Sequence, residues 1–397
     1  MYYHDRAAVA AAMKPLAGQP PRIRTDSSNP FAHHTIAVRV PAILSEVLER
    51  NPDYSAAVRE AVGELRDALA GNAPLPPIDR GLPHSETWTR ELLQRPGERW
   101  LDTDWFFAET YAYRTLVDRV HFWRTERDPF ASHKREEYAS AAHALALEHA
   151  LQQSGTAAER FHALLGAALW GNRIDLSFEA SRVRGTAARG EDLLLDDRDA
   201  AVRAAFDGEG PIQIVADNAG TELTMDLLLA DFFLQELGAA VAVHVKAHPT
   251  FVSDATAADV HGFLETASGV PAFERLRGAL GGGRLEILAH PYWNSPLSLW
   301  ELPSDLAASL SAARLVVLKG DANYRRALGD AIWPVETSFA DATAYFPAPL
   351  LALRTLKSDP VVGLDAAEAE RLDRLDPTWR VNGMRGVASF GGSGARA

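Results

Sequence analysis

Cysteine is absent from this chain of 397 residues. The absence excludes disulfides, thiolate zinc sites, iron–sulfur clusters and a cysteine nucleophile, so a bound metal would use Asp, Glu, Asn or His. Positive charge is also scarce, because 40 Lys and Arg face 53 Asp and Glu, which gives a formal net charge of −13. No local basic patch interrupts this balance, so we expect no nucleic-acid partner and no anionic-membrane surface.

Long hydrophobic runs and the commonest catalytic signatures are missing as well. No apolar run approaches the ~18 to 20 residues that cross a bilayer. The first 20 residues carry Asp5 and Arg6 ahead of a short alanine stretch, unlike a secretory signal, so we expect a soluble cytoplasmic protein. The sequence has no GxSxG, GxxxxGK or HExxH motif, which removes the usual support for a serine hydrolase, a P-loop protein or a zincin.

The composition that remains is that of an ordinary folded protein. Hydrophobic residues make up 47% of the chain and charged residues 23%, which excludes a largely disordered or fibrous protein. At about 150 residues per domain, the length predicts two or three domains. Only the Gly- and Ser-rich end, residues 391–397, is predicted to form a flexible tail, because it offers no apolar surface to order it.

The first part of the chain has the apolar spacing of helices. Within residues 54–71, apolar residues from Val58 to Leu69 recur every three or four positions, and this amphipathic stripe ends at Gly71. Clusters of β-branched residues are rare in this part. We therefore predict an α-helical N-terminal domain over residues 1–165, with helices over 36–51, 54–71, 105–123 and 135–153.

After about residue 205, short β-rich apolar runs alternate with helical stretches. The runs are almost continuously apolar, as expected for strands buried on both faces of a mostly parallel sheet. A helix over 222–238, closed by Gly238, separates the first two runs and makes a β-α-β unit. We predict a three-layer α/β/α domain over residues 166–390, with strands within 211–218, 240–248, 284–290, 313–321 and 350–357.

Polar residues follow the carboxyl ends of these strands, the edge at which open α/β sheets bind ligands. Asp217 and Asn218 end the first strand, and Asp254 lies beyond the second. Two carboxylates and one amide oxygen could hold a hard divalent cation, and the helix start after Asn218 favours an anion beside it. Each residue also has a local alternative, because Asx residues favour turns and Asp254 could cap the next helix.

Two further segments reach the same edge of the predicted sheet. In residues 319–325, glycine permits close backbone approach, Asp321 and Asn323 offer hydrogen bonds to hydroxyls, and Lys319 or Arg325 could meet a phosphate. Residues 354–357 place two cations at the end of the last strand. A structural turn and a solvated strand end are the alternatives for these two segments. Asp102-Thr103-Asp104 imitates a DxD phosphatase motif but follows no strand, so it is interpreted as a helix cap.

In combination, these segments are similar to one protein family. ADNAGTELTMDLLLADFFL, KAHPTFVSD, VVLKGDANYRRAL and RTLK occur in an order and spacing that resembles the damage-control phosphatases. The resemblance is to their hexose-phosphate subgroup, some members of which are also described as protein-glutamate O-methyltransferases. RVPAILSEVLE, WFFAETYAYRTL and LWGNRIDLSF (169–178) extend the resemblance over most of the chain, from about residue 20 to 390.

The resemblance implies a fold and a set of site residues. The family has an α-helical domain before an α/β/α domain, as the periodicity also predicts. A divalent metal, usually Mn²⁺ with Co²⁺, Ni²⁺ or Mg²⁺ as substitutes, would be held by Asp217, Asn218 and Asp254. With Lys357, these residues would form the catalytic group. The substrate would contact Gly320, Asp321, Ala322, Asn323, Tyr324, Arg354 and Lys357, and Glu222 falls at a position linked in the family to a proposed methyl-donor site.

The activity expected from this resemblance is hydrolysis of small phosphate monoesters, such as fructose 1-phosphate or fructose 6-phosphate. A metal opposite Lys357, with Lys319 as a second candidate cation, would clamp the phosphate, and the metal would lower the pKa of a bound water. Attack by water is favoured over an acyl phosphate on Asp217 or Asp254, but the sequence leaves both open. The oligomeric state is also open, with a monomer favoured.

Two other functions remain as alternatives. An S-adenosylmethionine-dependent carboxyl methyltransferase would be expected to have a GxGxG turn after the first strand, where this sequence reads DNAGTE. A metabolite-binding protein without turnover would keep the fold and be stabilised by ligand without releasing phosphate.

Overall fold

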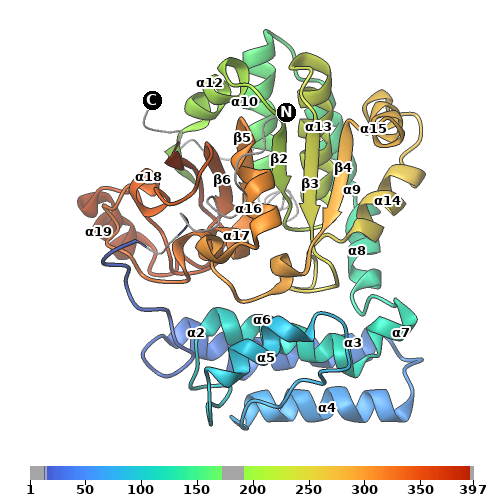
Figure 1. Ribbon diagram of the computed structural model, residues 1–397, viewed down its shortest axis with the longest axis vertical. Helices are drawn as coiled ribbons and strands as arrows, with labels where there is room; N and C mark the ends of the chain where they lie inside the picture. The colour runs from blue at the N-terminus through green and yellow to red at the C-terminus, as the bar shows by residue number, and fades with distance from the viewer. Residues whose placement is uncertain (1–12, 14–15, 172–191, 394–397) are drawn as a thin grey trace.

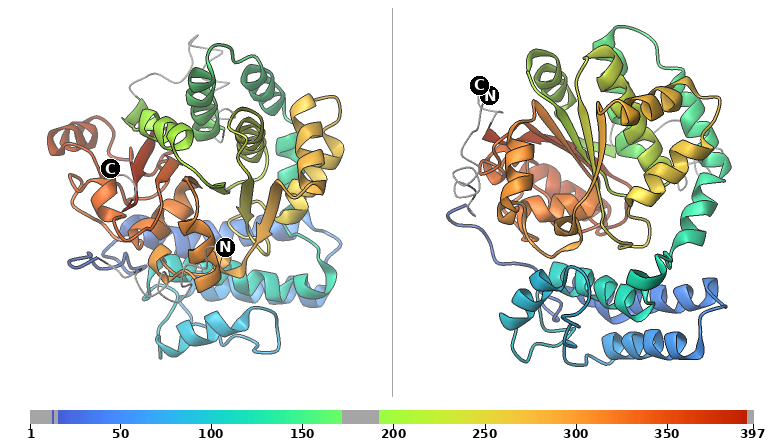
Figure 2. Two further views of the ribbon diagram at one scale, coloured as in Figure 1. Left: turned by 45° about the horizontal axis from the view of Figure 1, so that its top comes forward. Right: turned by 45° about the vertical axis from the view of Figure 1, so that its right-hand side comes forward.

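The computed structural model describes residues 13, 16–171 and 192–393. Its main division is between a layer of N-terminal helices and a larger unit built on a β-sheet (Figure 1). The same two parts are distinct when the molecule is turned (Figure 2). None of the helices in these described ranges is long and apolar enough to cross a membrane.

The N-terminal layer is helical, as predicted. The four apolar residues of the stripe in α4 are buried, and α6 is buried on almost every side, which makes it the centre of the layer. The helices of this layer are α2 (Pro30–His34), a π-helical stretch (Thr35–Arg39), α3 (Val40–Arg50), α4 (Ala56–Ala70), α5 (Ser85–Leu93), α6 (Trp105–Arg119) and α7 (Phe122–Thr125).

Two of the predicted helices are divided in the structure. The helix expected over 105–123 stops at Arg119, because His121 takes a left-handed conformation with φ 58° before α7 begins. The helix expected over 135–153 consists of α8 (Ala131–Tyr138) and α9 (Ala141–Leu151). Ser140 starts α9 by accepting a hydrogen bond from the His143 N–H at 3.1 Å, which is the contact of an N-cap.

Within the described ranges the sheet has seven strands in the order β1-β7-β6-β5-β2-β3-β4, and of their pairings only β6–β7 is antiparallel. The prediction of a mostly parallel sheet is therefore confirmed. Five strands match the predicted runs, whereas β1 and β7 were not predicted. The strands are β1 (Leu193–Asp196), β2 (Ile212–Val215), β3 (Val241–Val245), β4 (Leu285–Ala289), β5 (Leu315–Lys319), β6 (Leu350–Thr355) and β7 (Gly386–Gly391).

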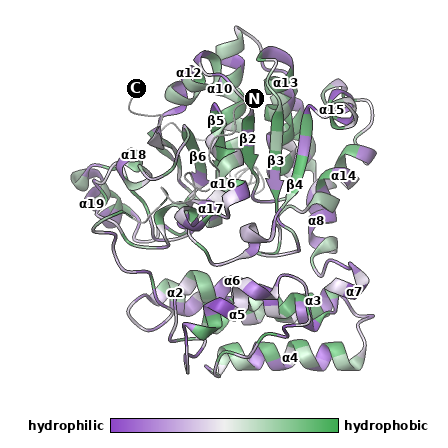
Figure 3. Cartoon of the chain, viewed as in Figure 1, coloured by the Kyte–Doolittle hydropathy of each residue, from purple (hydrophilic) through white to green (hydrophobic). Residues whose placement is uncertain are grey.

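Helices cover both faces of this sheet, which confirms the predicted α/β/α arrangement. Alternate residues of β5 show the two faces, because Leu315 and Val317 pack in one hydrophobic cluster and Val316 and Leu318 in another. Hydrophobic residues are concentrated on the central strands (Figure 3). The first cluster includes residues of α9, α10 (Ala157–Trp170), α12 (Arg198–Asp207), α13 (Thr221–Glu236), α14 (Ala257–Thr266) and α15 (Pro271–Gly281).

The opposite face is covered by short helices from the C-terminal part of the chain. They are the 3₁₀-helices Pro291–Asn294 and Leu299–Glu301, α16 (Ser304–Ser311), α17 (Gly320–Leu328) and α18 (Phe339–Ala342), while α19 (Ala366–Leu375) packs in a smaller cluster. α10 crosses the domain boundary predicted at residue 165, and the division into separately folding domains stays a prediction. Of the predicted tail, Gly391 ends β7, and residues 394–397 lie outside the described residues.

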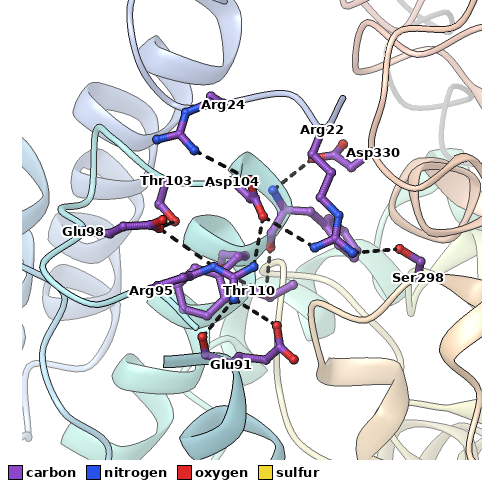
Figure 4. A network of polar contacts seen from close by, with 12 residues as sticks. Arg22, Arg24, Glu91, Arg95, Glu98, Thr103, Asp104, Thr110, Ser298 and Asp330 are labelled. Carbon is purple, nitrogen blue, oxygen red and sulfur yellow. Dashed lines mark hydrogen bonds and ion pairs between the residues drawn. The ribbon is translucent and has the colours of Figure 1, made fainter. Parts of the chain in front are cut away.

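A network of hydrogen bonds and ion pairs connects the helical layer to the α/β unit (Figure 4). Asp104 occupies the N-cap position of α6 and pairs with Arg22 at 3.4 Å and Arg95 at 2.9 Å. Arg22 also donates to Ser298 of the α/β unit at 3.3 Å, and Asp330 accepts from the first turn of α6. Asp104 therefore has the N-cap position predicted from the sequence, but its side chain makes ion pairs and no capping hydrogen bond to α6.

Candidate functional site

The ends of β2 and β3 bring together the acidic residues singled out in the sequence. Asp217 and Asn218 follow β2 directly, and Asp254 lies in the loop after β3. An isolated antiparallel bridge pairs Asn218 with Asp254, and the Asp217 carbonyl accepts from the Ala255 N–H at 2.7 Å. Main-chain hydrogen bonds therefore hold the two segments side by side, although 36 positions separate Asn218 from Asp254.

The loop that carries Asp254 has an unusual backbone. Phe251 and Val252 have φ values of 47° and 69°, in the left-handed region that non-glycine and especially β-branched residues avoid. Phe251 is held there by ring contacts with Phe106 and Tyr113 of α6. The helical layer thus fixes the loop that presents Asp254 to the site.

The side chains at this edge form a hydrogen-bonded cluster. The Asn218 amide donates to Asp217 Oδ2 and to Glu222 Oε2, both at 2.9 Å, and its oxygen accepts from Ser253 Oγ at 2.6 Å. Lys246 Nζ lies 3.1 Å from Asp254 Oδ2. These side chains come from strand ends, the adjoining loops and the first two turns of α13.

The cluster carries more buried negative than positive charge. Among the described residues, four carboxyl groups and two ammonium groups, each no more than 7% exposed, leave two negative charges in excess when all are ionised; they are Asp217, Glu222, Asp226, Asp254, Lys246 and Lys319. Burial, followed by the charges of Asp254 and Glu222, raises the pKa of Asp217. Burial also raises the pKa of Asp254, and that of Asp226 to about 7. A divalent cation would balance this excess.

The donor atoms of this cluster fit a hard divalent ion. Asp217 Oδ1 is buried and accepts no hydrogen bond from the described residues. Within the same residues, no group of three or more His, Asp or Glu side chains is arranged to hold a metal. A metal site here therefore depends on the Asn218 amide oxygen together with Asp217 and Asp254, which is the set that the sequence suggests, and its role as a ligand set stays a prediction.

The helix start beside Asn218 holds an anion, but this anion belongs to the chain itself. The Glu137 carboxylate of α8 accepts from the Thr221 N–H at 2.9 Å, at the first residue of α13. A Cβ added to Gly220 would lie 2.1 Å from the carboxyl carbon of Glu137. The phosphate position that the sequence suggests at this helix start is therefore filled by Glu137.

Two cations that the sequence suggests as phosphate-binding residues bind groups of the protein itself. Lys319 is completely buried beneath the cluster, where it donates to Glu222, Asp226 and the Ala168 carbonyl at 2.8–2.9 Å. Arg325 is buried between Glu109 and Asp330 and lies over the Trp105 ring. The expectation that either could meet a phosphate is wrong, because both side chains are buried and paired with carboxylates inside the protein.

The predicted substrate segments lie close to the cluster, but several of their side chains have structural partners. Asp321 accepts from Arg354 at 2.7 Å, and the remaining donors of Arg354 bond to Ser358 and to the Pro360 carbonyl. Asn323 and Tyr324 are completely buried, and Ala322 is half-buried. Contact of these residues with a substrate stays a prediction.

Lys357 differs from the other cations at this edge. It is half-buried, and no acceptor in the described part of the chain binds its ammonium group. Its charge lowers the pKa of Asp217, against the larger opposite effect of burial. A cation near the acidic cluster, with its donors free, is suited to an anionic ligand.

Gly320 is required by the packing of Asp217. Its φ is +81°, and a Cβ there would lie 1.9 Å from Asp217 Oδ2.

We expect Gly320→Ala to displace the Asp217 carboxylate and weaken Mn²⁺ binding, with a loss of stability of about 1–3 kcal/mol from backbone strain. Calorimetric Mn²⁺ titration and thermal unfolding measure both effects. The control is Gly262→Ala in α14, where no atom lies within 4 Å of the added Cβ; equal Mn²⁺ affinity in both variants would contradict the expectation.

Sequence reasoning missed several members of the site. Lys246 carried a signal, since a lysine ending an apolar strand needs a buried partner. Glu137 carried none, because it is 84 positions from Thr221 and reaches α13 only through tertiary packing. In LWGNRIDLSF, the residues from Asn172 to Phe178 lie outside the described residues.

The fold and the site together define an α/β/α protein with a buried acidic cluster at the carboxyl edge of its sheet. The damage-control phosphatase ARMT1-like domain matches residues 35–372. The chain therefore belongs to the ARMT1-like damage-control phosphatase family.

Relatives of this chain match over nearly all of its length. Damage-control phosphatase ARMT1 of Danio rerio is 30% identical over 426 residues, which cover 91% of this chain and 94% of the relative. The Mus musculus protein of the same name is 30% identical, and the match covers 95% of this chain and 100% of the relative. A DUF89 family protein from Pyrococcus horikoshii has a TM-score of 0.49 at 15% identity, covering 89% of this chain and 97% of its own.

Proposed function

We propose that this protein is a divalent-metal-dependent phosphatase that hydrolyses small phosphate monoesters. The observation that carries the proposal is the pair of excess negative charges buried at the sheet edge, near Lys357, whose ammonium group binds no acceptor among the residues that the structure describes. Membership of the damage-control phosphatase family and relatives named as phosphatases support the reaction class.

Asp217, Asn218 and Asp254 would hold the metal through oxygen atoms, the ligand type of hard divalent cations. We propose Mn²⁺ as the ion, with Co²⁺, Ni²⁺ or Mg²⁺ able to replace it. When bound, such an ion offsets phosphate charge and lowers the pKa of a water that it carries. Lys246 remains paired with Asp254 at 3.1 Å and holds that carboxylate in place.

Lys357 would bind the phosphate from the side opposite the acidic residues. Phosphoryl transfer depends on positioning and on charge neutralisation, and an ammonium group at this place would provide both. Arg354 supports this role indirectly, because its bond to Asp321 shapes the turn where the Lys357 N–H also donates to Asp321 at 3.2 Å. The RTLK segment that resembles the hexose-phosphate subgroup favours fructose 1-phosphate or fructose 6-phosphate as the substrate.

A panel of phosphate esters tests this function. Purified protein is incubated with hexose phosphates, other sugar phosphates and nucleotides, in Mn²⁺ or in excess chelator, and released phosphate is measured. We expect release that requires Mn²⁺ and is fastest with the fructose phosphates. Release that is unchanged by chelator would contradict the metal role. Ligand-induced thermal stabilisation without any release would instead indicate a binding protein.

A further inference from the structure

A chain of three buried side chains extends from the floor of the cluster to the Asn218 amide. Lys319 of β5 donates to Glu222 Oε1 at 2.9 Å, and Glu222 Oε2 accepts from Asn218 Nδ2 at 2.9 Å. All three side chains are buried, and Lys319 is completely so. The proposed reaction assigns no role to Lys319 or Glu222, although they lie directly behind a proposed metal ligand.

Lys319 determines the direction of the hydrogen bonds in this series of three side chains. An ammonium group has three donors and no acceptor. Its donors go to the Ala168 carbonyl, to Asp226 Oδ1 and to Glu222 Oε1. Glu222 Oε1 therefore accepts from Lys319, and within the described ranges the donor to its other oxygen is the Asn218 amide.

The same direction fixes the orientation of the Asn218 amide. Its nitrogen faces the two acids, Glu222 and Asp217, and its oxygen points the other way, where it accepts from Ser253 Oγ. An amide binds a cation through its oxygen and not through its protonated nitrogen. We propose that Lys319 and Glu222 are positioning residues that hold the Asn218 amide with its oxygen available to the metal.

The variant Glu222→Gln tests this inference, which rests on the proposed metal site. The amide oxygen introduced at position 222 would stay on Lys319, so the new NH₂ group would face the Asn218 nitrogen. The Asn218 amide would then turn its oxygen towards position 222 and away from the ion. We expect Mn²⁺ affinity, measured by calorimetry, to fall about 10- to 100-fold, the cost typical of a lost contact behind a metal ligand.

Exchanging the hydrogen-bond donor and acceptor between positions 218 and 222 separates the effect of side-chain orientation on Mn²⁺ affinity from the effect of charge. In the double variant Asn218→Asp, Glu222→Gln, the carboxylate at 218 accepts from the amide at 222, whose oxygen still accepts from Lys319. The net charge equals that of the original protein. We expect this variant to recover most of the Mn²⁺ affinity lost in Glu222→Gln, and failure to recover it would overturn the inference.

Asp226→Asn provides the matched control. It removes one negative charge from the same ammonium group, since Asp226 Oδ1 lies 2.8 Å from Lys319 Nζ, but it leaves the bonds of Asn218 intact. We expect it to lower Mn²⁺ affinity by a far smaller factor than Glu222→Gln. Equal losses would show that charge alone acts and would overturn the inference. Circular dichroism and thermal unfolding identify any variant that fails to fold.

Mn²⁺ binding by the unmodified protein and by Glu222→Gln distinguishes a failure of this inference from a failure of the proposed function. If the unmodified protein binds no Mn²⁺, the proposed metal site is wrong. If it binds Mn²⁺ and Glu222→Gln binds equally well, the metal site stands and the positioning role of Lys319 and Glu222 is wrong.

Discussion

Replacing Asp217 by asparagine is expected to slow metal-dependent phosphate release strongly while making the metal-free protein more stable. Asparagine keeps the shape of the side chain but removes one of the two excess charges buried in the cluster. A catalytic metal contributes several kcal/mol to transition-state stabilisation, and about 1.4 kcal/mol is a tenfold change in rate. We therefore expect kcat/KM to fall by at least about 10²-fold.

The stability effect has the opposite sign because burial without a cation disfavours the ionised carboxyl group of Asp217, as its raised pKa shows. Thermal unfolding in chelator should give a higher Tm for Asp217→Asn than for the unmodified protein, and added Mn²⁺ should stabilise only the latter. Asp231→Asn is the control, since Asp231 lies on the same helix as the cluster residue Glu222 but pairs with Arg275. A lower Tm in chelator for Asp217→Asn would contradict the account of the buried charge.

Replacing Lys357 by methionine is the second change with a large expected effect. Methionine keeps much of the side-chain length but cannot bind a phosphate. Loss of a donor that stabilises developing charge costs about 10²- to 10³-fold in rate, so we expect kcat/KM to fall by about that factor. Mn²⁺ affinity should be retained, because an ammonium group has no lone pair with which to bind a metal ion.

Two further variants define the role of Lys357. Lys357→Arg keeps the positive charge and should restore part of the activity, although its planar group binds phosphate with different geometry. Arg374→Met removes an exposed cation from α19 and should leave the kinetics unchanged. Full activity in Lys357→Met, measured with saturating Mn²⁺, would exclude Lys357 from phosphate binding.

Most of the fold follows from local patterns in the sequence. The buried strands of the parallel sheet are continuous apolar runs. The spacing of the apolar residues in α4 indicates a helix, and Gly238 lies just after the end of α13. The two strands that were not predicted lack such a pattern. β1 is an edge strand whose three leucines stand between acidic residues, and β7 consists largely of small residues, Gly-Val-Ala-Ser-Phe-Gly. β7 pairs with β6 antiparallel, and its place in the sheet depends on tertiary contacts.

The site was predictable where it depends on strand ends. Asp217, Asn218 and Asp254 each follow a strand, so the topology of a parallel sheet brings them to one edge. The direction in which a side chain points was not predictable. Lys319 is the last residue of β5, but its ammonium group turns under α13 to Glu222 and Asp226. A sequence gives the position of a cation along a strand, not the side of the sheet on which its partners lie.

The proposed activity depends on one divalent ion bound jointly by Asp217, Asn218 and Asp254. Crystals grown with Mn²⁺ and measured at the manganese absorption edge test it directly. The account predicts one anomalous peak at the carboxyl edge of the sheet, within about 2.0–2.4 Å of an oxygen from each of the three side chains. A fully loaded crystal whose manganese lies elsewhere, or whose three side chains point away from it, would contradict the account.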